Sequence, residues 1–255
     1  MKINVRKDLM HVLPWLIPIV LLLVWQGLSS LGVLSATVLP SPLGVIRAGI
    51  RLFKSGELMN NLGISLYRAM SGFLIGGITG FVLGLCNGIF KVSDSLFDSS
   101  VQMLRNVPHL SLIPLMILWF GIGETPKIVL VALGVLFPIY INTYHGIKYV
   151  DKELVEMGQA YGLNGLSLFT HIIFPGALSS ILVGVRYALG VMWTTLIVAE
   201  TISSNSGIGY MAMNAREFMQ MDVIVLSILI YALLGKCSDL IAKLFERRWL
   251  RWSQV

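Results

Sequence analysis

Long stretches without charge are the feature that most constrains this chain. Four blocks contain no Asp, Glu, Lys or Arg, and they cover residues 9–46, 69–90, 106–123 and 128–147. Each block supplies close to the roughly 20 apolar residues that a helix needs to cross a hydrocarbon core about 30 Å thick. Because lipid offers no hydrogen-bond partners, such blocks cross a bilayer as helices, whereas a barrel shows alternating segments of about 10 residues. The pattern predicts an all-α membrane protein.

The C-terminal third predicts two further spans. One begins near residue 177 and ends near residue 202, after a stretch whose glycines and proline indicate a loop and a short helix. The other covers residues 223–244 and contains Lys236 and Asp239. Only 13% of the residues are charged, against about 25% in a soluble domain. We therefore expect six transmembrane helices.

The distribution of Lys and Arg predicts the orientation. Inner segments would hold Lys2, Arg6, Lys7, Lys91, Arg105, Lys148, Lys152, Lys243, Arg247, Arg248 and Arg251, and outer segments Arg47, Arg51, Lys54, Lys127 and Arg216. The excess on one side predicts that both termini lie in the cytoplasm. Residues 41–58 are expected to lie along the membrane surface. The apolar run 9–28 is longer than the core of a signal peptide, so we expect a span rather than a cleaved leader.

A strip of small residues lies on the second predicted span. Its members recur every four residues: Gly72, Gly76, Gly80, Gly84 and Gly88. This spacing gives one helix face without side chains, where a neighbouring backbone can approach closely. We interpret the strip as a helix-packing surface; a glycine-lined pore is the alternative.

The segment between the fourth and fifth spans, residues 148–176, is predicted to lie inside. Apolar residues recur in it at helical spacing, at Val150, Leu154, Met157 and Tyr161, while acidic residues occupy other faces. Such a pattern predicts a short amphipathic helix that Gly162 can end.

This segment resembles the cytoplasmic signature of importer-type ABC permeases. That signature has a Glu-Ala-Ala triplet, three residues, a glycine, nine residues and Ile-x-Leu-Pro. The matching positions are Glu156, Met157, Gly158, Gly162, Ile172 and Pro175, with Met157 and Gly158 in place of the alanines and Phe174 in place of the leucine. The resemblance implies a helix-turn-helix, including Tyr161, that docks in a groove of an ATPase subunit. An ordinary amphipathic linker is the alternative.

Residues 103–123, 136–147 and 196–218 resemble permeases of the aliphatic-sulfonate importer, a branch that also contains taurine and nitrate permeases. The resemblance implies the fold of a type I ABC importer permease in a bacterial inner membrane. It further implies a homodimer, two cytoplasmic ATPase subunits and an extracytoplasmic substrate-binding protein. Taurine, nitrate or another small anion stays open as the substrate. A secondary transporter that works without ATP is a further alternative.

The sequence contains no phosphate-binding loop, no His-Glu-x-x-His, no Gly-x-Ser-x-Gly and no metal-spaced His or Cys cluster. We therefore expect no catalytic residue, metal or cofactor on this chain, and ATP hydrolysis on a separate subunit. A membrane-embedded enzyme would need convergent titratable groups, which are not recognisable here.

A translocation path for a compact anion needs a few donors or one cation among apolar walls. The candidates are Arg186, Trp193, Thr194, Thr195, Glu200, Asn142 and Tyr140. Arg186 could instead pair with Asp239 and hold two helices together. Arg68 could extend to the membrane surface or help to draw anions in. The expected division is an N-terminal span with its outer loop (1–57), a core (58–244) that contains the coupling loop, and a basic cytoplasmic tail (245–255).

Overall fold

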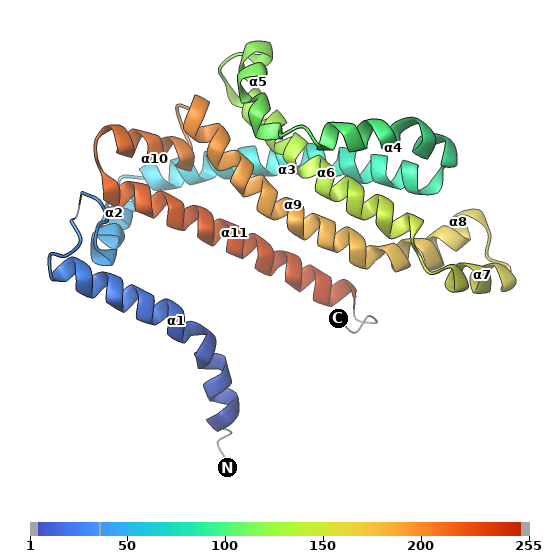
Figure 1. The fold of residues 1–255 in the computed structure, drawn as a ribbon, viewed down its shortest axis with the longest axis horizontal. Helices are drawn as coiled ribbons and strands as arrows, with labels where there is room; N and C mark the ends of the chain where they lie inside the picture. The colour runs from blue at the N-terminus through green and yellow to red at the C-terminus, as the bar shows by residue number, and fades with distance from the viewer. Residues whose placement is uncertain (1–4, 36, 251–255) are drawn as a thin grey trace. The chain divides into compact units, whose positions relative to one another are not determined.

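The computed structural model describes residues 5–35 and 37–250, and it describes side chains from residue 16 onward. Within these residues every regular element is helical (Figure 1). The elements are α1 (Val5–Ser30), α2 (Pro42–Lys54), α3 (Glu57–Ile89), α4 (Lys91–Arg105), η1 (His109–Leu112), α5 (Ile113–Phe120), α6 (Glu124–Lys148), α7 (Lys152–Ala160), α8 (Gly165–Leu168), η2 (Phe169–Ile173), α9 (Phe174–Ser203), α10 (Ile208–Glu217) and α11 (Met221–Trp249).

The chain divides into two compact units. The first contains residues 1–61 and 211–230, and the second contains residues 62–210 and 231–255. Lys2 and Arg251, which contribute to the predicted orientation, lie outside the described residues, as does the end of the tail.

Helix α3 approaches α6 closely in the second unit. A Cβ atom at Gly76 would lie 2.1 Å from the carbonyl oxygen of Ala132, and one at Gly80 would lie 2.4 Å from that of Leu136. The other strip glycines also face α6: Gly72 at Val131, Gly84 at Tyr140 and Thr143, and Gly88 at Ile147. The residue numbers rise together, so the two helices run parallel. Backbones this close tolerate only glycine.

The predicted span 106–123 is corrected by the structure. The helical run within it is only His109–Phe120, which is too short to cross a bilayer alone, and the preceding helix α4 is bent by 81° relative to this run. Two prolines interrupt the backbone hydrogen bonds: Pro108 precedes η1, and Pro114 lies in the first turn of α5.

The bent segment formed by α4, η1 and α5 nevertheless lies along α6. Near the end of α6 the hydroxyl of Tyr144 donates to Asp94 of α4 (2.7 Å), and near its beginning Leu130 packs with Met116 of α5. The segment therefore runs opposite to α6. Since α3 and α6 are parallel, it brings the chain back to the end of the unit where α3 enters it.

Helices α9 and α11 complete the second unit in alternating directions. Ser180 of α9 donates to the carbonyl of Asn142 (2.8 Å), and a Cβ at Gly184 would lie 2.5 Å from the Cβ of Asn142. On the other side of α9, the indole of Trp193 donates to the hydroxyl of Ser238 (2.9 Å).

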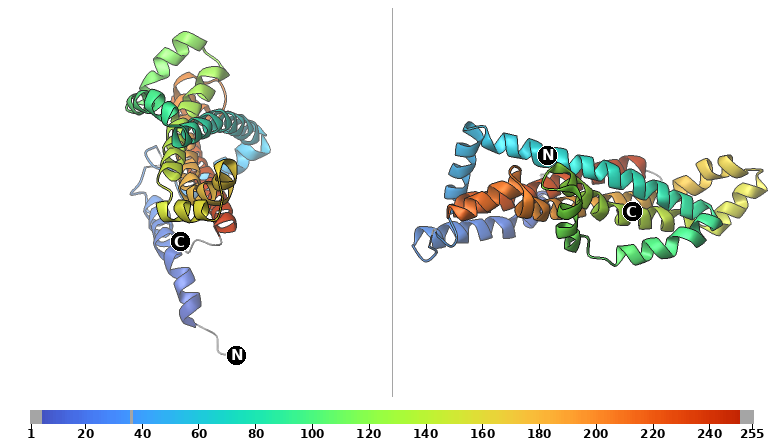
Figure 2. Two further views of the ribbon diagram at one scale, coloured as in Figure 1. Left: turned by 90° about the vertical axis from the view of Figure 1, so that its right-hand side faces the viewer. Right: turned by 90° about the horizontal axis from the view of Figure 1, so that it is seen from above.

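The start of the predicted fifth span is also corrected. α8, η2 and α9 form one helical run, Gly165–Ser203, of 39 residues, which begins twelve residues before the expected start at residue 177. The π-helical turn η2 makes this continuity possible: the N–H of Phe174 bonds to the carbonyl of Phe169, and Pro175, which has no N–H, follows directly. The α7–α8 hairpin projects from the end of the unit (Figure 2).

In the first unit, α2 is connected to the end of α1. The backbone N–H of Leu43 donates to the side chain of Gln26 (3.3 Å), and Ser41 caps the first turn of α2 by accepting from Gly44 (3.1 Å). A Cβ at Gly49 would contact Leu226 of α11 at 3.4 Å. These contacts orient the helix that was expected along the membrane surface.

The described residues contain four helices that are long and apolar enough to cross a membrane: α3, α6, the run Gly165–Ser203 and α11. The bent pair makes five if it counts as one span. The helix α1 has 26 residues, of which the described apolar part is Leu16–Ser30. The predicted count of six is therefore not reproduced as such, although the all-α membrane architecture is confirmed.

Candidate functional site

The first arm of the hairpin formed by α7 and α8 is helix α7, and both of its ends are defined by local structure. The carboxylate of Asp151 caps α7 by accepting the N–H of Glu153 (2.9 Å). The helix ends before Gly162, whose φ is +83°, and no atom lies within 4 Å of a Cβ built there. Glycine is therefore favoured at this position by backbone conformation and not by lack of space.

The two arms of the hairpin pack directly on each other. Gly158 is buried, and a Cβ built there would lie 2.9 Å from Leu168 Cδ1 and 3.1 Å from Ile172 Cγ1. This close contact explains glycine where the resembling signature has alanine. Ile172 and Pro175 are half-buried in the adjoining helical run. α7 is therefore packed against the helical run that leads into α9.

The outer surface of the hairpin is apolar and uncovered. Met157 is 46% exposed, Tyr161 82% and Leu166 77%, and Glu156 is exposed beside them. Large apolar side chains exposed together are typical of interaction sites. The apolar face expected from the spacing is thus available at Met157 and Tyr161, and it extends to Leu166 on the second arm.

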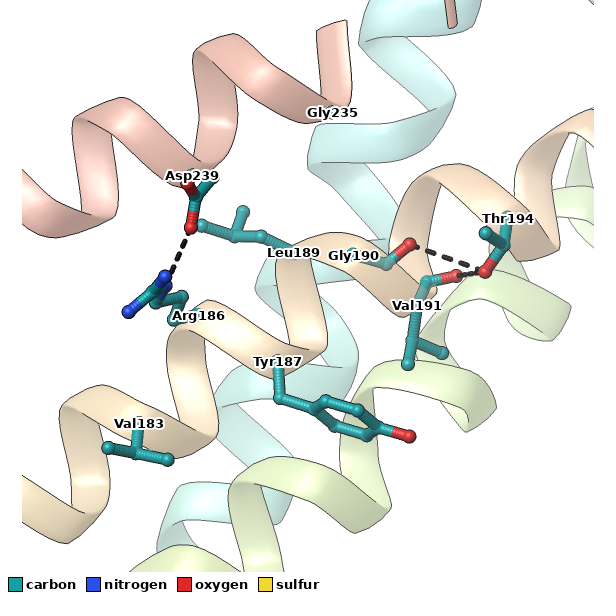
Figure 3. Close-up of a pocket in the computed structure, with 9 residues that line it drawn as sticks. All are labelled: Val183, Arg186, Tyr187, Leu189, Gly190, Val191, Thr194, Gly235 and Asp239. Carbon is teal, nitrogen blue, oxygen red and sulfur yellow. Dashed lines mark hydrogen bonds and ion pairs between the residues drawn. The ribbon is translucent and has the colours of Figure 1, made fainter. Parts of the chain in front are cut away.

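A cavity of about 610 Å³ lies beside α9 and α11 (Figure 3). Its lining is mainly apolar and consists of Val183, Arg186, Tyr187, Leu189, Gly190, Val191, Thr194, Gly235 and Asp239. This cavity is open to the outside, since Val183 is 51% and Tyr187 65% exposed.

Charged groups gather at one part of this cavity. The Nε of Arg186 donates to Oδ1 of Asp239 at 2.6 Å, and the ammonium groups of Lys243 and Lys236 lie 3.0 and 3.7 Å from the other carboxylate oxygen. The Nη1 of Arg186 lies 3.8 Å from Glu246. Three cations thus face two carboxylates, so the cluster has one net positive charge. The side chain of Arg186 is 40% exposed.

The cavity contains only two of the seven predicted path residues. Arg186 is one, and it makes the contact with Asp239 that was considered as its alternative role. Thr194 is the other, and its hydroxyl donates to carbonyls of its own helix, at Gly190 and Val191. Hydroxyls on helices commonly bond in this way.

The remaining candidates lie outside this cavity, and Trp193, Thr195 and Tyr140 make contacts between helices. Trp193 stacks edge-on against Tyr231, and Thr195 contacts His109 at 3.0 Å. The hydroxyl of Tyr140 donates to Asp98 (2.9 Å). The amide of Asn142 donates to the carbonyl of Pro138, and Glu200 is 1% exposed. The structure does not bring these residues to the cavity.

A buried charge cluster lies at the other end of the second unit, where α6 begins and α9 ends. We call it the Arg68–Glu200 cluster; it contains Ser65, Arg68, Glu124, Lys127, Glu200, Ser204, Ser206 and Tyr231. Arg68 is fully buried and does not extend to the surface, which corrects that expectation.

The geometry of this cluster satisfies both buried charges. Nη1 of Arg68 donates to Oε1 of Glu200 (2.8 Å) and to the carbonyl of Ser206 (2.7 Å), while Nη2 donates to Glu124 (2.6 Å). Glu200 also accepts from the backbone N–H of Gly209 (2.9 Å). A carboxylate and a guanidinium this deeply buried persist only when they are paired and hydrogen-bonded.

Comparison with known proteins adds three findings. Residues 72–251 match the family model described as the inner membrane component of binding-protein-dependent transport systems. The chain is 61% identical, over 98% of its length and 95% of the relative, to an Escherichia coli K12 protein named as an aliphatic sulfonates transport permease, SsuC. It is 45% identical, over 93% of its length and 86% of the relative, to a Bacillus subtilis 168 protein with the same name.

Among solved structures, the chain is similar to a crystal structure described as an amino acid ABC transporter with histidines. The TM-score is 0.63 at 19% identity, over 80% of this chain and 96% of that one. At this identity the likeness concerns the fold alone.

Proposed function

Because this chain belongs to the inner membrane components of binding-protein-dependent transport systems, we propose that it carries small organic sulfonates through the membrane as a permease subunit. The observation that carries the choice of substrate is the 61% identity, over nearly the whole chain, to a protein named for aliphatic sulfonates. The permease is a multi-pass membrane protein. Its proposed substrates, sulfonates, are compact anions with apolar tails.

The α7–α8 hairpin is the proposed contact with the ATPase subunit. Its residues Glu156, Met157, Gly158, Tyr161, Gly162, Ile172 and Pro175 form or support a surface that is apolar, exposed and close-packed beneath. ATP hydrolysis would occur on that subunit. The assembly would contain two permease copies, two ATPase subunits and one extracytoplasmic binding protein, with both permease termini in the cytoplasm. Residues 1–57, 58–244 and 245–255 would serve as anchor, transport core and tail, with the coupling loop at 148–176.

Replacing Tyr161 by alanine tests the docking surface. Its side chain is 82% exposed, so the fold should be unaffected, while loss of an aromatic contact at an interface costs about 2 kcal/mol or more, roughly 30-fold in affinity. The measurement is co-purification of the ATPase over a concentration series. Tyr187→Ala, at 65% exposure on α9, is the matched control and should leave ATPase binding unchanged. Equal binding by both variants would contradict the docking role.

The cavity beside α9 and α11 is the proposed part of the translocation path, with Arg186 as its cation. A sulfonate oxygen and an apolar tail match the combination of one guanidinium with the side chains of Val183, Tyr187 and Leu189. In this role Arg186 would exchange contacts between Asp239 and the passing anion.

The function is tested by uptake into vesicles that contain the permease with its ATPase and binding protein. A labelled short alkanesulfonate is expected to enter only when ATP is supplied on the ATPase side. An excess of unlabelled taurine or nitrate is expected to reduce this uptake less than the same excess of unlabelled alkanesulfonate. Uptake that persists without ATP on an ion gradient would indicate a secondary transporter. Preferential uptake of nitrate would reject the sulfonate assignment while keeping the permease. Preferential uptake of taurine, which is an amino-substituted sulfonate, would reject only the preference for unsubstituted alkanesulfonates.

A further inference from the structure

Helix α2 presents three different faces, although it has only 13 residues. The buried face carries Val45, Ala48 and Leu52. A second face is apolar and exposed, with Leu43, Ile46, Ile50 and Phe53 each between 51% and 59% accessible. A third face carries the exposed cations Arg47, Arg51 and Lys54. At 3.6 residues per turn, the exposed apolar stripe and the basic stripe lie side by side along the helix.

The position of α2 in the chain indicates where this helix lies relative to the membrane. It follows α1, to which the contact between Leu43 and Gln26 connects it, and it precedes α3, which begins at Glu57 directly after the turn at Gly56 (φ +80°). Of its two neighbours along the chain, α3 is long and apolar enough to cross a membrane, and α1 contains the apolar segment Leu16–Ser30. A helix between two such apolar helices is expected at the boundary between hydrocarbon and water. The sequence from residue 9 to residue 56 contains no acidic residue.

Charge and apolarity together identify the molecule that covers this surface. An amphipathic helix at a membrane boundary inserts its apolar stripe among acyl chains and presents Lys and Arg to lipid phosphates. Within the part of the chain that the structure describes, Arg51 alone of these three cations forms an ion pair, with Asp222 at 3.5 Å, and its side chain is still 62% exposed. A docked acidic protein would match the cations but would leave the four apolar side chains beside them unexplained.

We propose that the exposed faces of α2 bind anionic phospholipid, with the stripe Arg47, Arg51 and Lys54 contacting headgroup phosphates and the stripe Leu43, Ile46, Ile50 and Phe53 inserted between acyl chains. The site prefers phosphatidylglycerol over phosphatidylcholine, because the zwitterionic headgroup cancels most of the electrostatic attraction. Each basic residue contributes about fivefold to this preference. The inference does not depend on which substrate the permease carries.

The test uses the full-length permease purified in detergent and titrated with dioleoyl-phosphatidylglycerol or dioleoyl-phosphatidylcholine. Lipid retained per permease is counted by native mass spectrometry, and the thermal midpoint is followed in parallel. The wild-type chain is expected to prefer phosphatidylglycerol. The variant with Arg47→Gln, Arg51→Gln and Lys54→Gln is expected to lose about 100-fold of that preference.

Two further variants make the result decisive. Replacing Arg47 and Arg51 by lysine keeps the charge and is expected to retain the preference. Neutralising Lys91, Arg105 and Lys152, three exposed cations on other helices, removes the same charge and should change the preference by less than fivefold. Equal loss in this control, or equal binding of the two lipids by the wild-type chain, would overturn the proposal. So would an unchanged lipid preference in the α2 variant accompanied by loss of binding-protein-stimulated ATPase activity, since α2 would then bind a protein.

Discussion

Replacing Arg68 by glutamine is expected to lower the free energy of unfolding by about 3–5 kcal/mol. Arg68 and Glu200 are both fully buried, and the change leaves the Glu200 carboxylate without its guanidinium partner. Glu200 would keep neutral donors from Ser65, Gly209 and Tyr231, which cannot replace a full charge. The measurement is thermal or denaturant unfolding of the purified permease in detergent.

Glu124→Gln is the matched control for this prediction. Glu124 contacts the same guanidinium, but its side chain is 49% exposed, so water can take over part of its role. We expect a loss of about 1 kcal/mol or less, in the range of exposed ion pairs. Arg68→Lys should fall between the two, because lysine keeps the charge but loses the fork that reaches two carboxylates. Equal losses for Arg68→Gln and Glu124→Gln would contradict the buried-pair argument.

Adding a single methyl group at Gly76 is the second prediction with a large effect. In Gly76→Ala the new Cβ would lie 2.1 Å from the carbonyl oxygen of Ala132, a backbone atom that cannot rotate away. The two helices must separate, and overpacking of this kind costs about 1–3 kcal/mol or more. Unfolding in detergent and the yield of monodisperse protein both measure this loss.

The same helix offers a control of opposite sign. Gly63 also lies in α3, and no atom lies within 4 Å of a Cβ built there. Gly63→Ala is expected to stabilise the helix by up to about 1 kcal/mol, because alanine has the higher helix propensity. If both alanine variants changed stability in the same direction, the close approach of α3 and α6 would not be the cause.

The features that depend on local spacing could be predicted from the sequence. The glycines from Gly72 to Gly88 repeat on one helix face, so a close helix neighbour followed from the spacing alone. Gly162 and Pro175 stand at the distances of the permease signature, and the resemblance to that signature implies the hairpin. The spacing of the glycines does not identify the helix that packs on them. That neighbour, α6, is determined by tertiary contacts.

Other features depend on contacts between distant residues. Arg68 and Glu200 are 132 residues apart, so nothing local connects them, and each was interpreted separately. The break in residues 106–123 has a local signal in Pro108 and Pro114, but the absence of charge in this segment favours one continuous span. The sequence predicts how deep in the membrane Tyr140 and Glu200 lie, and this depth makes them candidates for the translocation path. Depth does not decide which face of a helix a residue occupies.

The continuous helical run Gly165–Ser203 has a mechanical consequence. At about 1.5 Å per residue, it is a shaft nearly 60 Å long. The exposed hairpin packs on one end through Gly158, Arg186 lies along its length, and Glu200 is fixed near the opposite end. If the ATPase subunit docks on the hairpin as proposed, a tilt of the hairpin would be carried along this helix to its Glu200 end, where the buried ion pair with Arg68 would oppose the movement.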